Sequence, residues 1–148
     1  MKVPFLIGRM LFGGFFLYNG IHHLTARAPL AQYARAKNVP MPEAAVTLSG
    51  IMLLFGGTSI LLGLKPKWGA AATIGFLAGV SPVMHDFWKS EDPNQRTGDM
   101  IHFMKNLALL GGALALAGTE EPWPASVHVQ HRGPLDKLRA SARELLSA

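Results

Sequence analysis

The residues best suited to chemistry gather between positions 84 and 106, in a polar stretch that separates two long apolar runs. His85 and Asp86 are adjacent, and His102 precedes Lys105 by three positions, which places these two side chains on one face of a helix. A carboxylate beside an imidazole tunes its proton affinity, and His and Lys can hydrogen-bond a carbonyl group or pass its protons. These four residues are therefore our candidates for catalytic proton handling.

The composition around this stretch is that of a membrane protein. Hydrophobic residues make up 49% of the 148 positions and charged residues only 16%, against about 25% in soluble domains. The net charge is +5, but no basic cluster with interleaved aromatics exists, so we expect a lipid bilayer and no nucleic acid as partner. The chain has no cysteine, which excludes disulfides and thiolate metal sites.

Four apolar segments are long enough to cross a hydrocarbon core of about 30 Å. They cover about residues 4–24, 44–64, 68–86 and 100–118. A cleaved signal peptide is the alternative for the first segment, but the Arg, Asn and two His residues within it favour a retained span. Short loops between the segments predict an all-α fold, an antiparallel four-helix transmembrane bundle over residues 1–118.

Two more helices are expected outside the four spans. Pro29 can begin a short interfacial helix after the first span, with Leu30 and Tyr33 on one face and Lys37 opposite. The polar tail over residues 119–148 contains an amphipathic helix at about 134–147, which suits the membrane surface or a partner protein. Lys and Arg are more numerous on the side of the two termini, which predicts cytoplasmic termini for a multi-pass protein of the cell membrane.

An antiparallel bundle brings polar residues from distant parts of the chain to one membrane face. The end of the first span, the end of the third and the start of the fourth must share that face. We expect Asn19, His22, Trp88 and Asn106 to contact a cofactor there. Arg9 is a fifth cofactor candidate, although it lies in the opposite half of the first span and could instead snorkel to the near interface. The whole set on this face is Tyr18, Asn19, His22, His23, His85, Asp86, Trp88, Asp99, His102, Lys105 and Asn106.

Several chemistries fit this set, and the residues alone leave them open. A quinone could be bound and protonated by His and Lys. Haem is disfavoured because no His lies mid-span opposite another. His residues with Asp86 and Asp99 could hold a transition metal. His128 and His131 in the tail are a second candidate pair, but they lack a third ligand at suitable spacing. We predict no metal site. The alternative for every member is an ordinary interface or capping residue.

Short motifs along the chain resemble the DoxX family of small four-helix membrane proteins. The resemblance covers about residues 5–118 and implies a prokaryotic integral membrane protein; some relatives are the membrane subunit of thiosulfate:quinone oxidoreductase. Leu53 stands where many members carry a Glu, three residues before a Gly pair. The matching stretches are residues 8–9, 13–17, 20, 39–42, 56–57, 62–64, 85–88 and 103–112.

These observations predict a quinone-linked redox component of a membrane oxidoreductase system that acts beside a redox-protein partner. One alternative is a non-enzymatic scaffold or assembly subunit, which the Gly-rich helix faces and the amphipathic tail favour. Another is a small-molecule carrier, which four spans could form only as a homo-oligomer.

Overall fold

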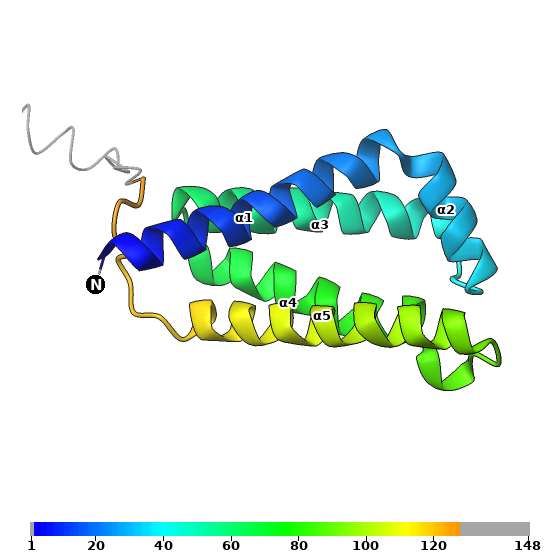
Figure 1. Ribbon diagram of the computed structural model, residues 1–148. Helices are drawn as coiled ribbons and strands as arrows, with labels where there is room; N and C mark the ends of the chain where they lie inside the picture. Colours follow the sequence, from blue (N-terminus) through cyan, green and yellow to red (C-terminus); the bar gives the residue numbers. More distant parts are fainter. Residues whose placement is uncertain (1, 128–148) are drawn as a thin grey trace, which may run out of the picture.

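The computed structural model describes residues 2–127, and over that range every regular element is a helix (Figure 1). This confirms the predicted all-α class. The four long helices run antiparallel, and two short helices lie between them at one end of the molecule. In chain order the elements are α1 (Lys2–Thr25), α2 (Arg27–Ala36), α3 (Pro42–Leu62), α4 (Pro66–Met84), η1 (Phe87–Lys89) and α5 (Pro93–Ala117). The predicted helix at 134–147 lies outside the described residues.

Two helix boundaries differ from the predicted spans. Helix α4 ends at Met84, before His85 and Asp86, and α5 begins at Pro93 instead of near residue 100. The early start of α5 has a local cause, because the Asp92 carboxylate accepts hydrogen bonds from the backbone N–H groups of Asn94 and Gln95. A capped N-terminus with Pro at its first position starts a helix irrespective of hydrophobicity, so a prediction from apolar length alone begins too late.

Two of the long helices, α3 and α5, are long and apolar enough to cross a membrane by length and composition. Among the described residues α1 and α4 do not meet the same measure. Large apolar side chains are nevertheless exposed along α1 as well as α5, for example Met10, Leu11, Ile101 and Leu107. Exposed apolar side chains in such numbers are typical of surfaces that contact lipid or another protein.

Helices α1 and α3 approach so closely that their backbones touch at glycines. A Cβ atom added to Gly57 would lie 2.4 Å from the backbone N of Leu17, and one added to Gly20 would lie 2.6 Å from that of Leu54. Glycine at these positions is therefore a packing requirement, because any side chain would push the two backbones apart.

Helix α3 packs against both α1 and α4, and α4 packs against α5. Leu53 lies fully buried in the core between Phe16 and Leu77. Helix α2 crosses the end of the bundle opposite the N-terminus, where it packs against α3 through Ala31 and Ala34 (Figure 1). The loop containing η1 lies at this same end, so the polar stretch and the end of α1 meet there, as the topology predicts.

Candidate functional site

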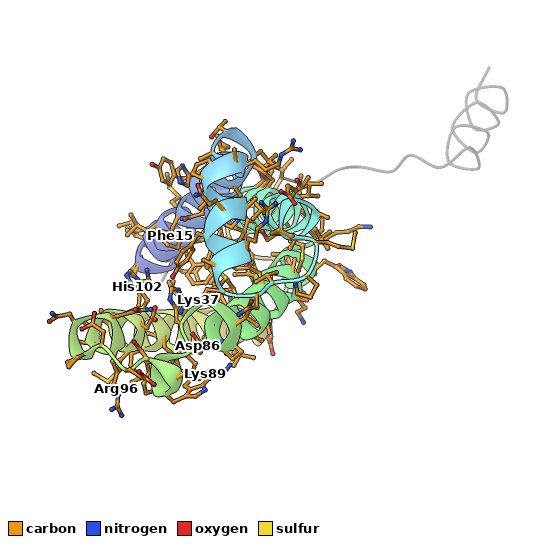
Figure 2. The ribbon with its side chains drawn as sticks, turned by 90° about the vertical axis from the view of Figure 1, so that its right-hand side faces the viewer. Phe15, Lys37, Asp86, Lys89, Arg96 and His102 are labelled. Carbon is orange, nitrogen blue, oxygen red and sulfur yellow. The ribbon has the colours of Figure 1, made fainter. Side chains whose placement is uncertain are left out.

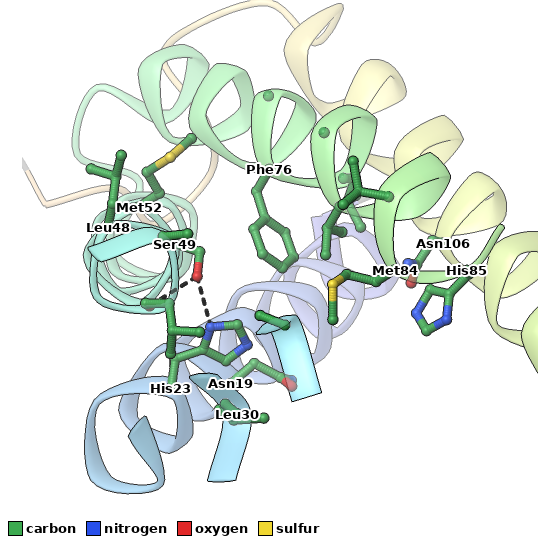
Figure 3. A pocket seen from close by; sticks show the side chains of 18 of the residues that line it. Asn19, His23, Leu30, Leu48, Ser49, Met52, Phe76, Met84, His85 and Asn106 are labelled. Atoms are coloured by element: carbon green, nitrogen blue, oxygen red, sulfur yellow. Dashed lines mark hydrogen bonds between the residues drawn. The ribbon is translucent and has the colours of Figure 1, made fainter. Parts of the chain in front are cut away.

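A cavity of about 490 Å³ opens at this end of the bundle, between α1, α3 and α4, with α2 beside it (Figure 3). Its walls are mostly apolar, with Phe15, Phe16, Phe76 and Leu77 among them. The polar residues that line it are Asn19, His23, Tyr33, Ser49, His85, Lys105 and Asn106. The cavity is thus an apolar chamber with a small number of polar groups.

An ion cluster lies beside the cavity, where three chain segments meet (Figure 2). The ammonium of Lys37 donates to Oδ1 of Asp86 at 2.8 Å and to Oδ2 of Asp99 at 3.1 Å. The side chains of Lys37 and Asp99 are only 14% and 8% exposed. Lys37 directly follows α2, and the next residue, Asn38, turns the chain with a φ of 58°. The cluster therefore joins the end of α2 to α5 and to the loop after α4.

The partners in this cluster hold each other in their charged forms. Burial acts to lower the pKa of Lys37, but hydrogen bonds to Asp86 and Asp99 outweigh it, and the net pKa is raised. The hydrogen bond from Lys37 in turn lowers the pKa of Asp86. Lys89 adds a second cation, 3.4 Å from Oδ2 of Asp86.

His85 connects the ion cluster to the cavity wall. Its Nδ1 lies 3.3 Å from Oδ1 of Asp99, and its ring stacks on that of His102 with centroids 5.1 Å apart. The ammonium of Lys105, which lines the cavity, lies 3.3 Å from Nδ1 of His102. Burial lowers the pKa of His85, while the hydrogen bond to Asp99 opposes the shift. The result is a continuous row of polar groups from Lys37 to Lys105.

The family model named DoxX matches residues 5–86 of the chain. The chain belongs to the DoxX family. No curated protein and no solved structure matches it. The match supports a membrane protein, and the apolar helices α3 and α5 agree with that assignment. It includes Lys37, His85 and Asp86, whereas Asp99, His102 and Lys105 follow the matched region.

The structure brings the four residues predicted for proton handling into one network in this DoxX chain. His85 and Lys105 line the cavity, His102 lies between them, and Asp86 is tied to the network through Lys37. Two of the predicted cofactor contacts, Asn19 and Asn106, also line the cavity. The amide of Asn19 donates to the carbonyl of Phe15 at 2.8 Å.

The other three predicted cofactor contacts lie elsewhere. His22 is exposed and stacks on the ring of Tyr18. Trp88 is half exposed and packs edge-on against Phe87 and Phe103. None of these residues lines the cavity.

Arg9 is 4% exposed and lies toward the opposite end of the bundle. Its guanidinium donates to the carbonyl oxygens of Pro124 and Ala125, at 2.8 and 3.2 Å. It therefore neither snorkels nor reaches the cavity; it holds the segment that follows α5.

Several polar residues of the site, among them Lys37, Tyr33 and Ser49, are absent from the set that the sequence predicts for this face. Lys37 was assigned to the solvent face of the interfacial helix. A usable signal exists, because Asp86 and Asp99 stand at the edges of the predicted apolar segments 68–86 and 100–118 and a buried carboxylate needs a cation. His23 and Ser49 form a second pair, with 2.9 Å between Nδ1 and Oγ, beside Phe76 (Figure 3). Within residues 2–127 no group of three or more His, Asp or Glu side chains is placed to hold a metal ion.

Proposed function

We propose that this DoxX-family protein binds a quinone in the cavity and acts as a quinone-linked redox component of the prokaryotic cytoplasmic membrane. In this proposal all four long helices cross the bilayer, with cytoplasmic termini, and electrons are exchanged with a redox-protein partner. The family relationship supports the membrane setting, and the cavity supports the ligand.

The observation that carries the proposal is the two-part character of the cavity. Its volume of about 490 Å³ is within the range of about 300–1,000 Å³ that small-molecule sites show. A quinone has an apolar ring that bears two carbonyl oxygens, and an apolar tail. The apolar walls suit the ring and the tail, while Lys105 and Asn106 can donate hydrogen bonds to an oxygen.

In this proposal the polar row connects bound quinone to the water at the end of the bundle where α2 and η1 lie (Figure 1). Lys105 lines the cavity and is also an exposed residue, and it contacts the exposed His102. Lys105 and His102 could therefore pass a proton between a ligand oxygen and the N-terminal end of α5, where the loop with η1 lies. This is the arrangement that general acid–base groups need, because they must reach both the ligand and a proton source.

The test is to purify the protein in detergent, extract it and identify bound quinone by mass spectrometry, then titrate the stripped protein with a short-chain quinone. Lys105→Met should weaken binding roughly tenfold or more, as expected when a charged donor is lost. Lys67→Met is the matched control, since Lys67 is an exposed lysine at the start of α4 that does not line the cavity.

Failure of the wild-type protein to bind quinone would refute the proposal. Equal loss in both Lys variants would show that the cavity is not the site. A partner oxidoreductase that co-purifies and stays fully active when His85 and Lys105 are replaced by Ala would favour the scaffold alternative.

A further inference from the structure

Asp99 is held as a hydrogen-bond acceptor on both of its oxygens. Its Oδ2 takes the ammonium of Lys37 at 3.1 Å, and its Oδ1 lies 3.3 Å from Nδ1 of His85. An ammonium can only donate hydrogen bonds, and its charge favours the ionised form of the carboxyl. Asp99 is only 7% exposed, so water competes little for either oxygen.

This arrangement determines which nitrogen of His85 carries the proton. An ionised carboxylate only accepts, so Nδ1 of His85 must be the N–H that donates to Asp99. A second proton on the ring is disfavoured because burial lowers the pKa of His85; Asp99 opposes this shift, His102 and Lys105 add to it, and the net pKa is lowered. The ring is therefore neutral at pH 7, with Nε2 unprotonated. A carboxylate behind an imidazole fixes the tautomer in this way in other sites.

The nitrogen left for a ligand is thus an acceptor. His85 lines the cavity and its Nδ1 is occupied by Asp99, so Nε2 is the ring nitrogen that remains available to a ligand. A hydroxyl group can donate to Nε2, whereas a carbonyl oxygen cannot and would set lone pair against lone pair. Lys105 does not discriminate in this manner, because its ammonium can donate to either kind of oxygen.

We propose that the cavity selects the reduced, hydroxyl-bearing form of its ligand, a quinol, because Lys37 and Asp99 hold His85 as a hydrogen-bond acceptor. In this assignment His85 contacts the ligand oxygen and distinguishes a hydroxyl from a carbonyl. Lys37 and Asp99 are positioning residues that act through His85. The inference rests on the proposed quinone function and adds the redox form that the site prefers.

The test compares a short-chain quinol with the matching quinone under anaerobic conditions, in the wild-type protein and in Asp99→Asn. The wild type should bind the quinol at least roughly tenfold more tightly, the cost of one buried unpaired group. In Asp99→Asn the amide oxygen stays on Lys37, and the NH₂ group turns to Nδ1 of His85. The ring proton then moves to Nε2, which becomes a donor. A carbonyl oxygen and a hydroxyl oxygen can both accept from it, so the preference for the quinol should be lost.

Asp92→Asn is the matched control, because Asp92 caps the N-terminus of α5, where Asn caps about equally well, and it does not line the cavity. This variant should keep the quinol preference. A measurement without ligand completes the test: ¹⁵N NMR of the His85 ring should show the proton on Nδ1 in the wild type and on Nε2 in Asp99→Asn.

The outcomes separate the two proposals. Equal binding of the two forms or tighter binding of the quinone by the wild type, an unchanged quinol preference in Asp99→Asn, or its loss in Asp92→Asn would overturn the quinol preference but leave the quinone function standing. An Nε2 proton in the wild-type spectrum would do the same. Failure to bind either form would overturn the quinone function itself.

Discussion

The ammonium of Lys37 lies 2.8 Å from Oδ1 of Asp86, 49 positions away along the chain. Because Lys37 follows α2 and Asp86 follows α4, this pair fastens α2 beside the cavity. The second bond of Lys37, to Asp99, extends the connection to α5. Lys37 therefore adds an ionic connection to the apolar packing of α2 on α3.

Lys37→Gln should loosen α2 and destabilise the fold. Removing Lys37 from a largely buried ion cluster leaves Asp99 without its ammonium and Asp86 with only the exposed Lys89, which costs on the order of 3 kcal/mol. Hydrogen exchange of α2 should become faster and the thermal midpoint should fall. Arg35→Gln is the control, since Arg35 pairs with Glu43 on the exposed side of α2 and exposed pairs contribute little. Equal effects of the two substitutions would contradict the fastening role.

The ion cluster also predicts how stability depends on pH. The pKa of Asp86 is lowered in the folded state by the hydrogen bond from Lys37. The ionised Asp86 therefore adds to the free energy of unfolding above the unfolded pKa of about 3.9. This stabilisation is lost as the pH falls through the lower pKa of the folded state. The pKa of Lys37 is raised despite its burial, so its contribution persists below about 10.4 and is lost only as the pH rises through the higher folded value. Thermal midpoints across this range should fall at both ends, and Lys37→Gln should flatten both slopes.

His85 should add a step nearer to neutral pH. Burial lowers its pKa in the folded protein, so the unfolded chain binds more protons once the pH falls below about 6.5. Stability should decline from that point downward, and His85→Gln should remove this step. The groups that face the ring are Asp99, His102 and Lys105 from α5. A profile that stays flat between about pH 6.5 and 5 in the wild type would disagree with a buried neutral imidazole.

The contact between α1 and α3 should tolerate no side chain at Gly57. Gly57→Ala places a Cβ 2.4 Å from the N atom of Leu17, and overpacking of this kind costs roughly 1–3 kcal/mol. Gly14→Ala is the matched control, because nothing lies within 4 Å of its Cβ position and Ala favours a helix. Thermal unfolding in detergent should show a loss for the first variant and none for the second.

Arg9 should act on the segment after α5 and not on the ligand. Arg9→Met removes the hydrogen bonds to Pro124 and Ala125, so hydrogen exchange around the buried Trp123 should become faster. Quinone affinity should stay as in the wild type, because Arg9 does not line the cavity. Arg96→Met, at an exposed position of α5, is the control for exchange. A tenfold loss of quinone affinity in Arg9→Met would restore the role that its place in the sequence suggested.

Much of the fold could be predicted from the sequence, because long apolar segments joined by short loops permit few arrangements. The antiparallel order alone placed His85, His102 and Lys105 at the same end as the C-terminal part of α1. The start of α5 was missed because the cap at Asp92 makes its first turns helical, although they are polar.

The parts of the site that could not be predicted depend on paths outside the long helices. Lys37 reaches Asp86 and Asp99 only because α2 folds across the end of the bundle, and neither periodicity nor charge pattern encodes that crossing. The partners of Arg9 are backbone carbonyls in the segment after α5, which carry no residue-type signature at all.

The central claim is that the cavity beside His85 and Lys105 is a quinone site. Titration of the stripped, detergent-purified protein with a short-chain quinone and its quinol, compared with Lys105→Met and Lys67→Met, tests it most directly. Saturable binding that weakens at least roughly tenfold in Lys105→Met and is unchanged in Lys67→Met is the result we predict. No saturable binding of either form, or the same affinity in all three proteins, would contradict it.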